Sequence, residues 1–134
     1  RNGSTMTFAT SVAKYLESLN YGKVGKDIFI NNIPLTNSNK ALNIAVYDTP
    51  SYAIVGRARN SVDFTCQIRV RASKAEQVLS CINSIYKLLN TGIMVDPEGK
   101  KFHVKQVNPP QFLTYDESNR VNWVLNITAL SGTY

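Results

Sequence analysis

Residues 61–72, with the sequence SVDFTCQIRVRA, alternate regularly between apolar and polar side chains. This period of two is typical of a β-strand that buries one face and leaves the other polar. The apolar face holds Val62, Phe64, Cys66, Ile68 and Val70, and the polar face holds Asp63, Thr65, Gln67, Arg69 and Arg71. We therefore expect a half-buried strand whose polar face carries Arg69 and Arg71 near its end. These two arginines could contact a nucleic acid, a neighbouring protein or only water.

The strand leads directly into an amphipathic segment, SKAEQVLSCINSIYKLLNTG. Ser73 and Glu76 have the spacing of a capping box, and Gly92 supplies a stop signal. The apolar face of the predicted helix consists of Val78, Leu79, Ile82, Ile85 and Leu89.

Patterns elsewhere predict the remaining elements. A first helix is expected over residues 8–20, with Thr7 as a possible cap, Gly22 after its end, and Phe8, Val12, Leu16 and Leu19 on its apolar face. Strands are expected at residues 28–30 and 42–48, in a hairpin over 93–108 that turns at Asp96-Pro97-Glu98-Gly99, and at 121–130.

The predicted order is α-β-β-β-α-β-β-β. This order indicates an α+β fold with a mainly antiparallel sheet of about five to six strands and two helices packed on one face.

Length and composition point to one domain. The chain has 134 residues, of which 43% are hydrophobic, and this is enough for one compact core. The start RNGSTM reads as an expression-tag remnant at residues 1–5 followed by a native start at Met6, so that residues 6–134 form the expected domain. No apolar stretch approaches the roughly 20 residues of a membrane helix, and we expect no membrane association.

The chain is moderately basic, with 15 Lys and Arg against 9 Asp and Glu. The basic residues are dispersed, apart from local pairs such as Arg57/Arg59, and this favours ordinary solvated faces over a nucleic-acid patch. Tyr47 and Tyr52 could stack bases, but the outward positions of residues 61–72 lack the aromatic pattern of RNA-recognition domains. A small nucleic-acid-binding module is kept as an alternative.

No group of residues suggests catalysis. The single histidine, His103, has no acid or nucleophile near it in sequence, and Asp96 and Glu98 belong to a predicted turn. Cys66 and Cys81 lack metal-ligand spacing and read as free thiols, although a disulfide between them is conceivable. We expect neither enzymatic activity nor a cofactor or metal site.

The segment SYAIVGRARN is more apolar in its first half than an ordinary loop. It is interpreted as an arm whose Tyr52, Ile54 and Val55 contact other subunits. The alternative, an arm folded back onto its own core, is equally compatible with its composition.

Several short motifs occur together in a recognisable order. They are KDIFINNIP, then NIAVYDTP, then a strand that ends in VRA and runs into a helix, then a Pro-Pro segment followed by YDESNRVNWVLNI. In this order the chain resembles the minor capsid or tail terminator proteins of bacteriophages with long non-contractile tails. The likeness extends over nearly the whole domain from Met6.

The resemblance implies a structural virion protein that forms a ring, commonly a hexamer, at the head-proximal end of the tail tube. Such a ring would stop tail polymerisation and join the tail to the head, with the tail tube protein and a head-completion or connector protein as partners. The candidate residues for the subunit interface or the DNA channel are Tyr52, Ile54, Val55, Arg57, Arg59, Arg69 and Arg71. A head-completion protein on the portal side is the alternative within the same particle.

Overall fold

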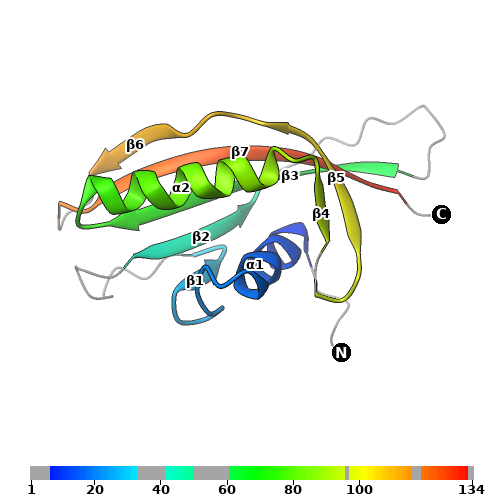
Figure 1. The fold of residues 1–134 in the computed structure, drawn as a ribbon, viewed down its shortest axis with the longest axis horizontal. Helices are drawn as coiled ribbons and strands as arrows, with labels where there is room; N and C mark the ends of the chain where they lie inside the picture. Colours follow the sequence, from blue (N-terminus) through cyan, green and yellow to red (C-terminus); the bar gives the residue numbers. More distant parts are fainter. Residues whose placement is uncertain (1–6, 33–41, 50–60, 96, 116–118, 133–134) are drawn as a thin grey trace.

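The computed structural model describes residues 7–32, 42–49, 61–95, 97–115 and 119–132. Two helices and one curled mixed sheet make up this part of the chain (Figure 1). The elements are α1 (Phe8–Ser18), β1 (Ile28–Ile30), β2 (Asn43–Asp48), β3 (Ser61–Ala72), α2 (Ala75–Leu89), β4 (Ile93–Val95), β5 (Lys101–Val107), β6 (Gln111–Tyr115) and β7 (Val121–Gly132). The predicted α+β class and element order are confirmed, with β6 as an additional strand.

The two longest strands form the centre of the sheet. β3 and β7 run antiparallel over their whole length, from Ser61 opposite Gly132 to Ala72 opposite Val121. The sheet order is β1-β2-β3-β7-β5-β4, and β6 also pairs with β7. All pairings are antiparallel except that of β1 with β2, which makes the sheet mixed.

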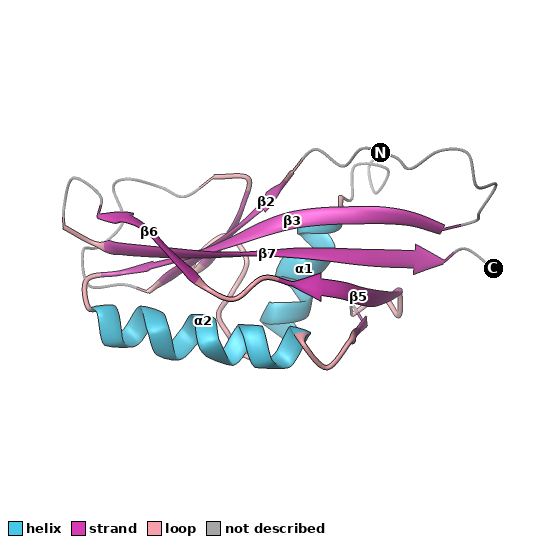
Figure 2. Ribbon diagram, turned by 90° about the horizontal axis from the view of Figure 1, so that it is seen from above, coloured by secondary structure: helices cyan, strands magenta, loops and turns pink. Residues whose placement is uncertain are grey.

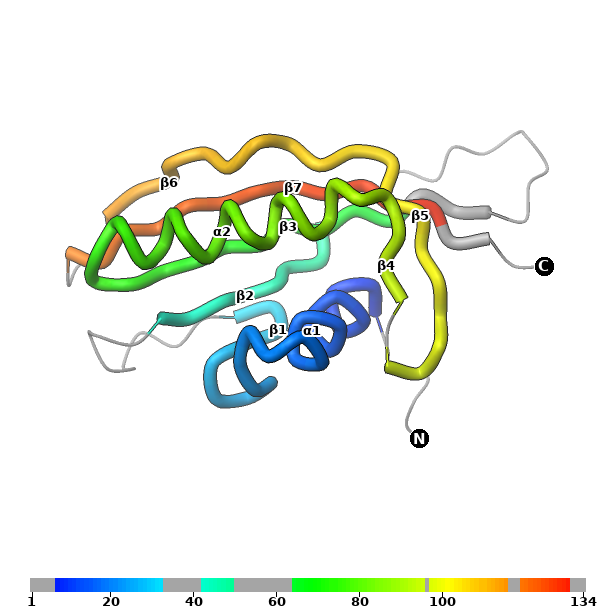
Figure 3. Tube along the Cα trace, in the orientation of Figure 1, coloured from blue at the N-terminus to red at the C-terminus, as the bar shows by residue number. Residues whose placement is uncertain are grey.

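β5 and β6 share one side of β7. β6 pairs with the first part of β7, from Val121 to Val124, whereas β5 pairs with the later part, from Ile127 to Leu130. Pro109 and Pro110 lie between the two strands and interrupt the pairing, because proline has no backbone N–H to donate. The tube in Figure 3 follows this path along β7.

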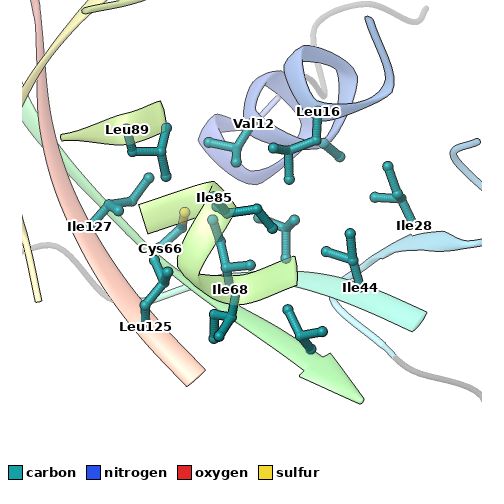
Figure 4. Close-up of a cluster of buried hydrophobic side chains, with 14 of the residues drawn as sticks. Val12, Leu16, Ile28, Ile44, Cys66, Ile68, Ile85, Leu89, Leu125 and Ile127 are labelled. Carbon is teal, nitrogen blue, oxygen red and sulfur yellow. The ribbon is translucent and has the colours of Figure 1, made fainter. Parts of the chain in front are cut away.

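Both helices pack against the same face of the sheet, and one continuous core lies between them and the strands. Figure 4 shows Val12 and Leu16 of α1 and Ile85 and Leu89 of α2 around the alternate residues of β3 and β7. Figure 2 shows α2 running alongside these strands. Fully buried members of this core are Val12, Leu16, Ile28, Val46, Ile68, Val70, Val78, Ile82, Ile85, Leu89, Met94, Leu125 and Ile127. The predicted apolar side chains of β3 from Phe64 to Val70 therefore point into the core, as do the alternate residues of β7 from Val121 to Ala129.

The helix ends differ from expectation in detail. The Thr7 cap is confirmed, because its hydroxyl accepts a hydrogen bond from the backbone N–H of Thr10 at 3.4 Å. However, α1 ends at Ser18, and Leu19 is exposed instead of lying on the apolar face. Asn20, with φ of 68°, supplies the left-handed residue after the helix, a role expected of Gly22.

The predicted capping box of α2 is wrong. The N-cap residue is Lys74, which makes no side-chain capping hydrogen bond. The helix begins one residue later than the spacing of Ser73 and Glu76 requires, so that Ser73 lies outside the cap position. At the other end, Gly92 adopts a φ of 96°, as its role as a stop signal requires.

Candidate assembly surface

The strand that the sequence did not predict, β6, carries the largest exposed apolar side chains among the described residues. All five of its residues are exposed, and Phe112, Leu113 and Tyr115 have exposed fractions between 41% and 62%. We call these three residues the β6 patch. The Phe112 ring lies 5.2 Å from that of Tyr115 and 6.0 Å from that of Trp123, measured between centroids. The aromatic side chains therefore form a small continuous surface supported by β7.

A second exposed apolar surface lies on β4. Ile93 and Val95 are 48% and 41% exposed, whereas Met94 between them is buried in the core. Their cross-strand partners on β5 are the exposed His103 and Lys101. We call Ile93 and Val95, with these two basic neighbours, the β4 patch. Period-two alternation places it on the face of the hairpin opposite the core.

The sheet face opposite the helices is polar along β3. The Arg69 guanidinium carbon lies 5.1 Å from the centroid of the Tyr47 ring, and its Nη2 donates to Gln67 Oε1 at 3.4 Å. Gln67 in turn donates to Asn126 on β7 at 3.5 Å. Arg69 is partly exposed, as predicted, but it covers the ring of Tyr47 that was considered for stacking bases.

Arg71 does not lie on an open face, and this part of the prediction is wrong. Its side chain is only 1% exposed, and its Nη2 donates to Asn43 Oδ1 on β2 at 2.8 Å. Arg120, which precedes β7, is equally buried. Both arginines lie near the end of β3 at which Ala72 pairs with Val121. Arg71 thus belongs to a buried polar cluster within the subunit.

The other predicted interface residues cannot be placed. Tyr52, Ile54, Val55, Arg57 and Arg59 lie outside the described residues. The proposed arm and its contacts remain predictions.

The described residues offer little reactive chemistry. Burial raises the pKa of the Cys81 thiol to about 11 and that of Cys66 well above its usual value, so both thiols are protonated at neutral pH. Both cysteines are free, and His103 is exposed on β5. In this part of the chain no three His, Cys, Asp or Glu side chains gather as a metal site would require. Neither of its helices has the length and apolar content that crossing a membrane demands.

These features define a class of protein. A small α+β domain whose strands expose large apolar side chains is typical of proteins that bind other proteins through those surfaces.

Comparison with known proteins gives the family. Residues 15–130 match the family described as bacteriophage tail terminator protein, and the chain belongs to this family. Membership places it among the structural proteins of bacteriophage tails and confirms the resemblance drawn from the sequence.

Comparison with solved structures supports the fold. One solved structure, which carries no functional name, aligns with a TM-score of 0.57 and 13% identity over 95% of this chain and 92% of its own. At this identity the likeness establishes the fold alone. No curated protein matches the chain.

Sequence reasoning missed β6 although a signal was present. The segment QFLTY has high β-propensity and lies between Pro110 and an acidic segment. A bulge between Phe112 and Thr114 breaks its alternation, and its pairing partner β7 follows a separate turn.

Proposed function

We propose that this protein is the tail terminator of its phage, a ring of identical subunits at the head-proximal end of the tail tube. The observation that supports this most directly is the family match over residues 15–130. The ring, commonly a hexamer in the resemblance described above, would bind the last ring of the tail tube protein. It acts by assembly and requires no catalysis.

The physical logic concerns how a polymer stops growing. A tube of identical subunits continues to grow for as long as its end presents the surface that the next subunit binds. A cap that matches the tube on one side and presents a different surface on the other removes that end. The opposite surface is then available to a head-completion or connector protein. Two unlike exposed edges on a rigid core are compatible with such a subunit.

Arg69 has a proposed role in this ring. Because it remains partly exposed, it could contact an acidic group at the subunit seam or the phosphates of passing DNA. Contact with phosphate would be transient and blind to sequence, since positive charge alone does not read bases. Arg71, buried within the subunit, is not suited to either role.

Deletion of the gene that encodes this protein from the phage genome tests the proposal. Phage that lack the protein should accumulate DNA-filled heads and separate tails of uncontrolled length, measured by negative-stain microscopy. Expression of the protein in trans should restore tails of uniform length joined to heads. Tails of normal length in the deletion mutant would contradict the proposal.

Immunogold labelling separates the two positions within the particle. A tail terminator should be labelled at one end of purified headless tails. Label on tailless heads alone would instead favour the head-completion protein. The protein is proposed to reside in the virion neck, after assembly in the host cytoplasm.

A further inference from the structure

The free edge of β6 carries neither charge nor proline, two of the features that normally protect an edge strand. Gln111–Tyr115 contains no charged residue and no proline, although the bulge at Leu113 interrupts its regularity. Among the described strands β6 pairs only with β7, so its other side is unpaired. Natural proteins usually protect such edges with charge, proline, a bulge or a covering element, and β6 has only the bulge. Because this edge carries three large exposed apolar side chains and no charge, we expect a partner to cover it.

A complementary surface exists on the same chain. The β4 patch lies at the other end of β7, because β5 pairs with residues 127–130 and β6 with residues 121–124 (Figure 1). It combines the aliphatic side chains of Ile93 and Val95 with the exposed basic side chains of Lys101 and His103. The β6 patch is aromatic. Aliphatic groups pack on aromatic rings, and cations bind to ring faces.

We propose that the β6 patch of one copy binds the β4 patch of the next copy, forming the seam between neighbouring subunits. This inference rests on the proposed function, because it describes the contact between subunits that would close the proposed ring. The occupant is a second copy because both halves of a complementary contact lie on one chain at opposite ends. Such a head-to-tail contact between unlike patches generates a ring when its rotation closes. Contact between two β6 patches would instead produce a two-fold dimer and would leave the basic residues of the β4 patch, Lys101 and His103 on β5, without aromatic partners.

The contact can be examined by disulfide cross-linking on isolated tail tubes. Leu113→Cys and Val95→Cys chains are mixed with the tubes, oxidised, and separated on a non-reducing gel. A cross-linked dimer is expected only when both variants are present. The native thiols give a low background, because the pKa values of Cys66 and Cys81 are raised by burial. Ile93→Cys provides a second position on β4 in case one pair has unsuitable geometry.

Leu19 provides the matched control. It is 42% exposed, nearly the same as Leu113, but it lies at the end of α1 and belongs to neither patch. Leu19→Cys mixed with Val95→Cys should yield no specific dimer. A double Leu113→Cys, Val95→Cys chain should give a ladder of oligomers that ends at the size of the closed ring.

A second measurement does not depend on disulfide geometry. Phe112→Ser should reduce the amount of protein bound to tubes by at least about tenfold, as the loss of a central aromatic at an interface typically does. Because Phe112 is 47% exposed, the variant should still fold, which its circular dichroism and thermal transition would verify. Leu19→Ser should bind like the original protein.

The outcomes distinguish a failure of the proposed subunit contact from a failure of the proposed function. A dimer from Leu113→Cys alone would overturn the proposal in favour of two-fold pairing. The seam would also be overturned if both β4 positions failed to cross-link and Phe112→Ser bound normally. Overlong tails in the deletion phage would then still support tail termination. Conversely, a cross-link between Leu113→Cys and a β4 cysteine of another copy would support the proposed contact. If the deletion phage also made tails of normal length, the proposed function would be contradicted.

Discussion

Arg69 and Arg71 lie two residues apart on the same face of β3, yet their surroundings differ. Arg69 is opposite Ala45 and Val124 and extends over the ring of Tyr47. Arg71 is opposite Asn43 and Asn122, both buried polar residues. A buried guanidinium is tolerated only where polar groups receive its N–H donors. At this position β2 provides one such group, the side-chain Oδ1 of Asn43.

Replacement of Arg71 should therefore be costly. Arg71→Met removes a buried charge-assisted hydrogen bond and leaves the side-chain Oδ1 of Asn43 without this donor. We therefore expect a loss of about 2 to 4 kcal/mol in the free energy of unfolding. Arg69→Met loses mainly a partly exposed contact with Tyr47, worth less than about 1 kcal/mol. Urea denaturation of the two variants measures the difference. Equal losses would contradict the structural distinction between the two arginines.

At the scale of single elements, α2 shows how a one-residue shift changes a cap. Lys74 stands at the N-cap position without a side-chain hydrogen bond to the helix. A lysine there also places positive charge beside the positive end of the helix dipole. The capping motif predicted from Ser73 and Glu76 is present in the sequence but does not coincide with the start of the helix.

Two substitutions test this description of the helix start. Lys74→Asp should stabilise the protein by about 1 kcal/mol, because aspartate can accept from the free N–H groups and interacts favourably with the dipole. Ser73→Ala should change the stability by less than about 0.5 kcal/mol, since Ser73 does not cap the helix. Thermal unfolding of both variants provides the measurement. A loss of about 1 kcal/mol for Ser73→Ala would indicate that the capping box forms after all.

For the whole molecule, the single core implies cooperative behaviour. α1 packs on β1, β2 and β3, whereas α2 packs on β3, β5 and β7, and the two helices share one cluster of buried residues. β3 connects the two halves. A domain of this size with one core is expected to unfold in a single transition.

Core truncations on the two helices test this expectation. Leu16→Ala on α1 and Ile85→Ala on α2 each remove a fully buried side chain and should each cost about 2 to 5 kcal/mol. In both variants, fluorescence of Trp123 and far-UV circular dichroism should report the same midpoint in urea. Two separated transitions in Leu16→Ala would indicate that α1 with β1 and β2 unfolds as an independent unit.

The sequence by itself determined the elements with regular periodicity, although not β6, because side-chain periodicity is a local property of the backbone. The alternation of residues 61–72 predicted β3 and its core side chains from Phe64 to Val70. The spacing in α2 predicted the buried Val78, Ile82, Ile85 and Leu89, whereas Leu79 is only half-buried. Family membership was also accessible from the order of short motifs.

Only the tertiary structure decided which polar residues are buried and which edges are open. Arg69 and Arg71 are equivalent by periodicity, and their difference arises from the partners that β2 and β7 place beside them. β6 exists as a strand because β7, which follows it in the chain, pairs with it beside β5. Its free edge is likewise a property of the assembled sheet. Pairing between strands is non-local, and exposure at a sheet edge is fixed only once every neighbour has found its place.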